Sequence, residues 1–335
     1  MANITQTTVA DGVKTQYERR LLVRAVPRLV HGRWGIPARL NKYGSLEWRK
    51  YGALSAITAA LTEGTTPSEQ ATPSLTLVTA TPLFYGAWIG YTDEIDMTVF
   101  DPLVSEVSGI LGEQAGLSVD TLIRNTLTAG ATKDYSGNQT ARNALQTPAH
   151  DVTYADFVKQ VAALEAANAM TVDGDSYICI MHSYTWASLM MDPTFVNLFI
   201  EGEGGKALRD GFVGRVMRCN IYVTSNGRSY ADGGANSTED VYSMLFIAGE
   251  SYGVTGMAGI APKMVDTAGV SGKNLTGAGK RASPVELIMK GLGSAGADDP
   301  LNQRGTIAWK TGFDTDLLNA AWCRDLEHVN VFSAD

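Results

Sequence analysis

The feature that most constrains the fold is a long amphipathic pattern that starts after Asp101-Pro102. Apolar residues recur there every three to four positions through to about Leu127, which at about 1.5 Å per residue predicts one helix roughly 40 Å long. Asp is a good N-cap, and Pro is tolerated at the first helical position. The glycines inside this pattern each cost about 1 kcal/mol relative to alanine, so we expect another element to pack closely against the helix.

The clearest strand pattern lies just before this helix, in residues 83–91 (LFYGAWIGY). Apolar side chains occupy both sets of alternate positions, which predicts a core strand that is covered on both faces. Thr153-Tyr-Ala-Asp156 is a capping box and predicts a helix that runs to about Ala169. Further helices are expected at 14–31 and 182–191, and further strands at 45–51, 75–92, 177–181, 215–225, 240–248, 285–290 and 306–313. The last two strands are expected to return to the first core, and the mixture indicates an α+β fold.

Composition excludes several classes of protein. Hydrophobic residues make up 44% of the chain and charged residues 19%, which is typical of a globular protein. We find neither the run of about eighteen apolar residues that a membrane span needs nor the apolar segment of a secretion signal. We therefore expect a cytoplasmic protein that contacts no membrane. The three cysteines lack the spacing of zinc sites or disulfide frameworks, so we expect them to be buried, reduced thiols.

The charge of the chain is unevenly distributed. Residues 1–50 carry ten Lys/Arg and three Asp/Glu, a net charge of +7, whereas the whole chain carries −8, so the remaining residues carry −15. Such a basic N-terminal arm could contact nucleic acid, or it could pair with the acidic body of another copy. The simpler interpretation is a solvated basic face of a helix.

A search for catalytic and metal-binding patterns gives no candidate. The histidines are far apart, and neither zinc-ligand spacing nor a G-x-S-x-G nucleophile elbow is present. Residues 291–296 satisfy G-x-G-x-x-G, but two aspartates and a proline follow where a helix should open towards a pyrophosphate, so we interpret this segment as a turn. The acidic group Asp93, Glu94 and Asp96 is interpreted as a solvated or interface edge. We therefore expect no catalytic residue, cofactor or metal.

Several short blocks occur in a fixed order between about residues 60 and 310. They are Leu61-Thr62-Glu63-Gly64 with Pro67, Val78-Thr79-Ala80-Thr81 with Tyr85-Gly86, Leu111-Gly112-Glu113-Gln114-Ala115 with Asp120, Asp192-Pro193-Thr194-Phe195, and DPLNQRGT (299–306) with Trp309-Lys310. Together they resemble the major capsid proteins of tailed phages in the N-four-type (podophage) coat family. DPLNQRGT is the most specific block. The sequence departs from the family at His182-Ser183, where His-Pro is common, and in residues 130–150 and 200–240, which match no block.

The resemblance implies the α+β Hong Kong 97 shell fold, without a catalytic site. It divides the chain into an N-terminal arm (1–30), an extended E-loop hairpin (31–80), a peripheral domain with a long spine helix (81–150), an axial domain (151–284) and a return to the peripheral domain (285–335).

The implied function is that of a major capsid protein. Copies would assemble in the cytoplasm of a bacterial host into hexamers and pentamers, and these would form the icosahedral shell of a virion around double-stranded DNA. A portal and possible scaffolding or decoration proteins would be further partners. An acidic chain would contact the DNA only weakly and without sequence specificity.

Energetics also suggest that the segment 31–80 needs a surface from outside its own chain. Ordering about 35 residues costs roughly 35–70 kcal/mol of backbone entropy, and an isolated two-stranded hairpin cannot offset that cost. Aromatic residues and arginine are favoured at interfaces. The residues predicted to contact a neighbouring subunit are Arg19, Arg20, Arg24, Arg28, Trp34, Tyr43, Trp48, Arg49, Tyr51 and Glu63. The alternative is that the aromatic residues pack in the chain's own core.

Two other functions stay open on the sequence. An encapsulin-like nanocompartment would have the same fold but would enclose an enzyme instead of a genome. A soluble hydrolase with unrecognised active residues would form a small oligomer instead of a shell.

Overall fold

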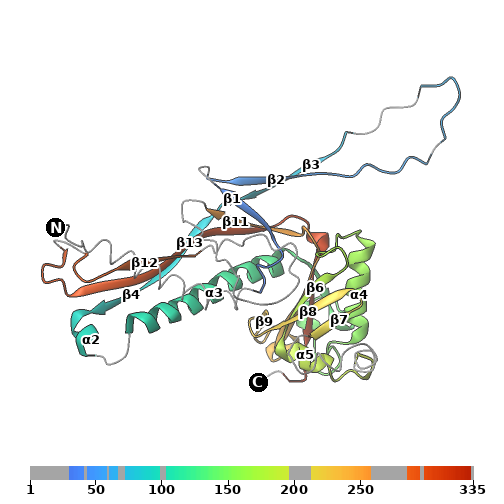
Figure 1. Ribbon diagram of the computed structural model, residues 1–335. Coiled ribbons are helices and arrows are strands. Elements are labelled where there is room, and N and C mark those ends of the chain that lie inside the picture. The colour runs from blue at the N-terminus through green and yellow to red at the C-terminus, as the bar shows by residue number, and fades with distance from the viewer. Residues whose placement is uncertain are drawn as a thin grey trace.

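The computed structural model describes residues 30–40, 44–58, 60–66, 72–98, 103–195, 213–257, 285–294 and 298–332. The chain forms an elongated body with a sheet and a long helix at one end, a second sheet with shorter helices at the other, and a hairpin that projects away from both (Figure 1). The predicted helix at 14–31 lies almost entirely outside the described residues, as do the predicted interface residues Arg19, Arg20, Arg24, Arg28 and Tyr43.

The first sheet has five strands and is built around one long central strand. Its members are β1 (Ile36–Leu40), β4 (Leu83–Thr92), β11 (Tyr252–Met257), β12 (Val285–Lys290) and β13 (Arg304–Leu317). β4 pairs antiparallel with one edge of β13, and β12 and β11 follow one another along the other edge. The strands predicted at 285–290 and 306–313 are confirmed, and their return to the first core is confirmed as well.

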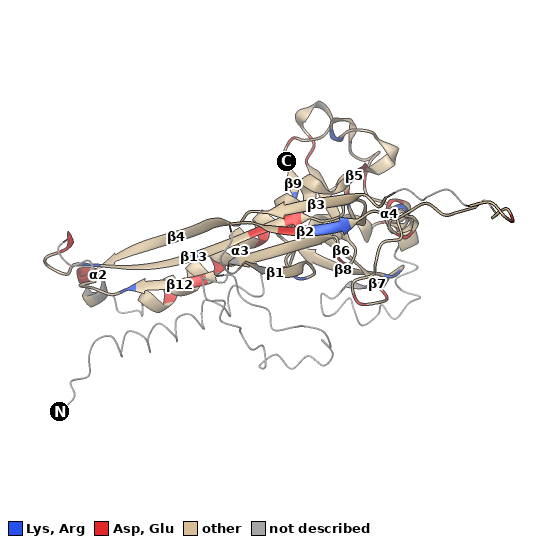
Figure 2. Cartoon of the chain, turned by 90° about the horizontal axis from the view of Figure 1, so that it is seen from above, with Lys and Arg blue, Asp and Glu red and all other residues tan. Residues whose placement is uncertain are grey.

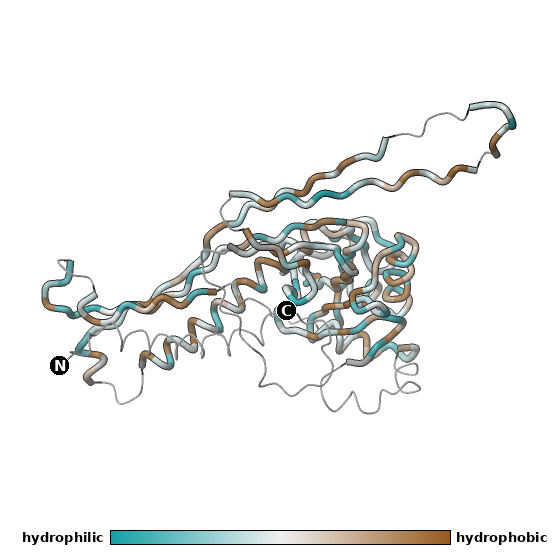
Figure 3. The backbone as a smooth tube through the Cα atoms, turned by 45° about the horizontal axis from the view of Figure 1, so that its top comes forward, coloured by the Kyte–Doolittle hydropathy of each residue, from teal (hydrophilic) through white to brown (hydrophobic). Residues whose placement is uncertain are grey.

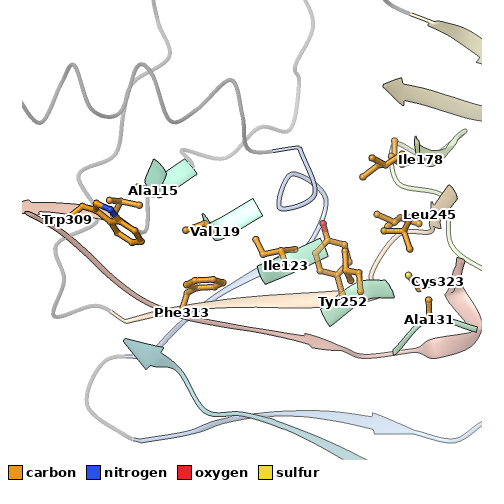
Figure 4. Packing of buried hydrophobic residues seen from close by; sticks show 14 of the residues in the cluster. Ala115, Val119, Ile123, Ala131, Ile178, Leu245, Tyr252, Trp309, Phe313 and Cys323 are labelled. Atoms are coloured by element: carbon orange, nitrogen blue, oxygen red, sulfur yellow. The ribbon is translucent and has the colours of Figure 1, made fainter. Parts of the chain in front are cut away.

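The predicted long helix is α3 (Leu103–Gly130), which lies along one face of this sheet. At about 1.5 Å per residue its 28 residues span about 42 Å. Figure 4 shows Ala115, Val119 and Ile123 packed with the aromatic residues of the sheet, including Phe313. The glycines at 109, 112 and 116 of α3 are buried.

The strand β4 differs from its prediction. Tyr85, Ala87 and Tyr91 pack against the core, but the opposite face of the strand, with Phe84 and Trp88, is exposed. The prediction that both faces are covered is therefore wrong for a single chain. The physical reason is that α3 covers only one face of the sheet, and the described residues place no second layer on the other.

The second sheet has seven strands and its own core. Its members are β5 (Thr132–Tyr135), β6 (Tyr177–His182), β7 (Val213–Val216), β8 (Cys219–Thr224), β9 (Ser229–Tyr230), β10 (Val241–Ile247) and β14 (Cys323–Val329). The helices α4 (Tyr154–Ala166) and α5 (Ser183–Leu189) accompany it. The predicted capping box is confirmed: Asp156 N donates to Thr153 Oγ1 at 3.3 Å, and Thr153 N donates to Asp156 Oδ2 at 3.3 Å.

Two predictions for this sheet need correction. The single strand predicted at 215–225 is a hairpin of β7 and β8, because Met217 and Arg218 turn the chain with positive φ angles of 45° and 60°. The segment 285–335 returns to the first sheet only in part, because β14 lies between β5 and β10 in the second sheet. Conversely β11, inside the predicted axial segment, belongs to the first sheet.

The two sheets are joined by three short connections of the described chain. These lie between α3 and β5, between β10 and β11, and between β13 and β14. Main-chain bonds reinforce the last one, since the N–H groups of Leu318 and Asn319 both donate to Ser251 O, at 2.8 and 3.1 Å. No single cut in the sequence therefore separates the sheets into two units.

The remaining described elements are short. They are β2 (Leu46–Tyr51), β3 (Leu75–Ala80), α2 (Asp93–Thr98) and the 3₁₀ turns η2 (Ser136–Asn138), η3 (Arg142–Ala144), η5 (Ala235–Ser237) and η7 (Ala320–Trp322). The described start of the glycine motif at 291–294 is a turn, as predicted, with Ser294 N donating to Gly291 O at 3.2 Å. Within the described parts of the chain, no helix combines the length and the apolar character that crossing a membrane requires.

Candidate functional site

The β2–β3 hairpin projects from the body and leaves its far part uncovered (Figures 1 and 3). The two strands pair in register from Leu46–Ala80 to Tyr51–Leu75. Every side chain described between 53 and 66 is exposed, and Leu61 reaches 77% exposure. Exposed apolar residues gathered on one segment are typical of a contact surface.

The root of the hairpin is fixed to the body. The indole of Trp48 lies on the backbone of Gly253 in β11, where a Cβ atom would come within 2.5 Å of Trp48 Cζ2. Lys50 Nζ lies 5.6 Å from the centre of the Trp322 ring, which is a cation–π distance. These contacts set the direction of the hairpin before any neighbour is present.

The predicted interface residues fall into three groups. Trp34 and Trp48 contact the chain's own body, since the ring centroid of Trp34 lies 4.8 Å from that of Tyr222. Tyr51, Arg49 and Glu63 are exposed on the hairpin. The basic residues of the arm and Tyr43 lie outside the described residues. The role of all ten as interface residues stays a prediction, and for the two tryptophans the structure supports the alternative of packing within the chain.

Trp48 provides a direct test of the hairpin root. Trp48→Ala is expected to leave the unassembled chain folded, with a loss of at most about 2 kcal/mol because the indole is only half-buried, while shell yield falls. Circular dichroism and sedimentation measure the two quantities. Gly253→Ala should reproduce the effect, because the added methyl group would displace the indole of Trp48 from the backbone of β11. Unchanged shell yield in both variants would contradict a role for this contact.

A second candidate surface lies on the outer face of β4, and sequence reasoning missed it. Trp88 is 69% exposed and lies opposite Ala308 of β13, with Gly86 and Gly90 two residues away on the same face. Lys310 Nζ lies 4.6 Å from the centre of the Phe84 ring. The sequence could have indicated this surface, because large aromatic residues alternate with glycine at positions 84, 86, 88 and 90. The aromatic side chains therefore project from a face whose neighbouring positions carry no side chain.

The most specific block of the sequence forms a turn at the end of the first sheet. Asp299 is buried, its Oδ2 accepts from Arg304 N at 2.7 Å and its main-chain oxygen accepts from Asn302 N at 3.0 Å. This turn leaves Leu301 exposed. The block therefore shapes a loop and presents an apolar side chain at the tip of the body.

The buried carboxylate of Asp120 holds the first described residues in place. Its Oδ1 accepts from Val30 N and His31 N, both at 2.8 Å. Its Oδ2 lies 2.9 Å from His31 Nδ1 and accepts from Asn226 Nδ2 at 2.8 Å. Burial opposes ionisation, but the hydrogen bonds from His31 and Asn226 and the charge of His31 keep the pKa of Asp120 below its ordinary value. Tyr252 adds a further tie, since its hydroxyl donates to His31 O.

Metal chemistry and thiol chemistry have no visible support in the described part of the chain. No three His, Cys, Asp or Glu side chains there lie close enough to hold a metal ion. Cys179, Cys219 and Cys323 are all free and buried, as predicted. Burial raises the pKa of Cys179 and Cys323, which keeps them as unreactive thiols.

Comparison with known proteins gives a consistent picture. A family model described as phage capsid protein matches residues 74–315, whereas no curated protein sequence matches. Among solved structures, the capsid asymmetric unit of cyanophage Pam1 aligns with a TM-score of 0.64 and 12% identity over 92% of this chain and 93% of that chain. The capsid of cyanophage P-SCSP1u gives 0.61 and 14% over 88% and 86%. The capsid of Ralstonia phage GP4 gives 0.61 and 14% over 89% and 88%.

Proposed function

The chain belongs to the phage capsid protein family and is a coat protein of the shell, with the Hong Kong 97 type of fold. From this premise we propose that its copies form hexamers and pentamers of an icosahedral shell around double-stranded DNA, and that this shell assembles in the cytoplasm of the bacterial host. A portal, and scaffolding or decoration proteins where they occur, would be further partners. The proposed role is structural and includes no catalytic step.

The observation that carries the proposal is that the chain has two different exposed apolar surfaces. One is the outward face of the hairpin, where Tyr51 pairs with Leu75 and both are exposed. The other is the outer face of β4 around Trp88. Contacts between two unlike surfaces are heterologous and can repeat from copy to copy until a ring or shell closes. We therefore propose that the hairpin of one copy covers the β4 face of the next.

Charge is consistent with this pairing. Glu63 is the sole charged residue between 53 and 66. Next to β4, the outer face of the first sheet carries Lys310 opposite Gly86 and Lys290 in register with Gly90, with Glu286 opposite Lys310. The same face of β13 also carries Arg304 at one end and Asp314 and Asp316 towards the other. Figure 2 shows a basic stretch at the end of β2. Glu63 of one copy would therefore pair with Lys310 or Lys290 of the next, which favours the correct partner.

Trp88→Ser tests the β4 face. Truncating a central aromatic residue typically costs more than 1 kcal/mol per contact, so each contact should weaken about tenfold and shells should fail to form because the same contact repeats across all copies. Sedimentation measures assembly, and circular dichroism checks that the chain stays folded. Met191→Ser is the matched control. Met191 is 68% exposed, and it follows α5, which packs with the second sheet. Normal shells from Trp88→Ser would contradict the proposal.

The nature of the contents separates a virion shell from a nanocompartment of the same fold. Particles from infected cells should protect double-stranded DNA from added nuclease. Particles that protect an enzyme and no DNA would favour the nanocompartment.

A further inference from the structure

Basic side chains gather around the ring of Tyr230 on β9, on a chain whose net charge is −8. We call this group the Tyr230 patch, and its members are Arg124, Lys133, Arg142, Arg228 and Tyr230. The guanidinium carbon of Arg142 lies 3.5 Å from the ring centre, that of Arg228 lies 4.6 Å away, and Lys133 Nζ lies 5.6 Å away. The ring of Tyr230 is thus a platform that holds three cations near one another.

Two of these cations have a carboxylate partner. Lys133 Nζ lies 2.6 Å from Glu327 Oε1, and Arg142 Nε lies 2.6 Å from Glu327 Oε2. Asp325 is a weaker partner, with its Oδ2 at 3.9 Å from Lys133 Nζ. The positive charges of Lys133 and Arg142 are therefore largely compensated by carboxylates of the same chain.

The other two cations have neutral acceptors only. Arg124 donates to Asn226 Oδ1 at 2.9 Å and to the main-chain oxygen of Asn226 at 3.0 Å. Arg124 Nη2 and Arg228 Nη1 both donate to Asn125 Oδ1, at 3.1 and 3.0 Å. Arg228 Nε is buried and has no acceptor. Within the described ranges, no carboxylate oxygen lies within 4.0 Å of either guanidinium.

Two like charges that share one amide oxygen repel each other. Burial, and secondly the charge of Arg228, lowers the pKa of Arg124 from its ordinary value, whereas Asp120 opposes this shift through its charge. Asp120 contacts Asn226 rather than either arginine. An added anion beside the half-buried side chain of Arg228 would relieve this repulsion.

The chemistry of the patch fits a phosphate group. A guanidinium carries several N–H donors in one plane and binds phosphate oxygens through those that are accessible. Double-stranded DNA offers such groups at one charge per about 1.7 Å of its axis. Phosphate contacts carry no sequence information, so binding through the patch would be independent of sequence.

We propose that the Tyr230 patch is a binding site for the phosphate backbone of the enclosed DNA, with Arg228 as the residue that contacts phosphate. The inference rests on the proposed function, because it takes the contents of the shell to be DNA. It adds to that function a localised site on an otherwise acidic subunit, where the DNA would bind weakly.

The test measures binding of the unassembled full-length chain to a random-sequence DNA duplex by fluorescence anisotropy over a range of salt concentrations. Arg228→Gln is expected to weaken binding several-fold and to reduce the slope of log affinity against log salt by about one, as loss of one phosphate contact does. Arg228→Lys keeps the charge and should retain most of the slope. Inorganic phosphate should compete with DNA more strongly than chloride does at matched ionic strength.

Arg215→Gln is the matched control. Arg215 lies on β7 and is exposed, and its Nη1 lies 2.6 Å from Asp175 Oδ2. It should leave DNA binding unchanged. Wild-type binding and slope in Arg228→Gln would overturn the proposal, as would an equal loss in both variants. A loss of shells from Arg228→Gln with unchanged DNA binding would show that the patch binds a carboxylate of another copy instead. Shell formation is scored separately by sedimentation, so failure of assembly in the wild type counts against the proposed function and leaves the DNA result readable.

Discussion

Glu327→Gln is expected to destabilise the unassembled chain by about 3 kcal/mol at pH 7, the lower end of the range for removing one partner from a buried ion pair. The lower end applies because Lys133 and Arg142 keep about 30% of their side-chain surface exposed, whereas the Glu327 side chain is fully buried. The substitution removes the negative charge and turns one of the two acceptor oxygens into an NH₂ donor that faces a cation, so the ion pairs that hold β5 and η3 against β14 are lost. Urea unfolding followed by circular dichroism measures the change.

Asp325→Asn is the matched control two residues away on the same strand, and the opposite outcome is expected. Burial, followed by the charge of Glu327, raises the pKa of Asp325 to about 7, although Ser243 donates a hydrogen bond to it. Between about pH 4 and pH 7 the folded chain therefore keeps a proton that the unfolded chain has released. This contribution to stability is complete below about pH 4 and is lost as the pH rises to 7, a change on the order of 4 kcal/mol.

Asp325→Asn should remove most of that slope and should cost little stability at pH 8. Glu327 behaves in the opposite sense: burial disfavours its charge, but the hydrogen bonds from Arg142 and Lys133 lower its pKa. Its contribution is present above its ordinary pKa and is lost as the pH falls through the lowered value. Equal effects of the two substitutions, or an unchanged pH profile in Asp325→Asn, would contradict this account of the strand.

Asp120→Ala is the second substitution with a large expected effect, a loss of about 3–5 kcal/mol. It removes the acceptor for the main-chain N–H groups of Val30 and His31 and for Asn226 Nδ2, all buried or half-buried. Unpaired polar groups in such positions carry their full desolvation cost. The stability that Asp120 contributes should also fade as the pH falls through its lowered pKa, because protonation removes the charge that these donors stabilise.

Thermal unfolding of the full-length chain, with sedimentation of assembled material, measures both consequences of Asp120→Ala. Glu106→Ala on the same helix is the control, since Glu106 is exposed and surface carboxylates typically contribute 1 kcal/mol or less. A stable Asp120→Ala chain that assembles normally would show that the first described residues are held by other contacts.

Local patterns predicted the elements whose causes are local. The spacing of apolar residues predicted α3, the Thr153–Asp156 box predicted the start of α4, and the strand-like segments at 45–51 and 75–92 predicted β2 and β3. The hairpin of β7 and β8 was missed because its turn uses Met217 and Arg218 at positive φ, and neither residue type signals such a turn. The place of β14 in the second sheet was missed because its partners, β5 and β10, are distant in the sequence.

The candidate site divides in the same way. Tyr51 was predicted to contact a neighbouring subunit, and in the single chain it is exposed. Trp34 and Trp48 were predicted to do the same, but they contact residues on distant strands that no spacing could indicate. Asp120 was noticed only as part of a motif, and its bond to His31 joins residues 89 positions apart. Glu327 and Arg228 carry no local signal at all, because their importance comes from the side chains that the fold brings beside them.

The three connections between the sheets have a mechanical consequence. A load applied to the outer end of the first sheet reaches the second through α3, β11 and β13 in parallel, so no single peptide segment carries it alone. The plate formed by the two sheets should resist bending at its middle, and outward pressure from packed contents would be transmitted to the rims where copies meet. When the shell expands, the contacts between subunits would then deform before the fold of any single subunit does.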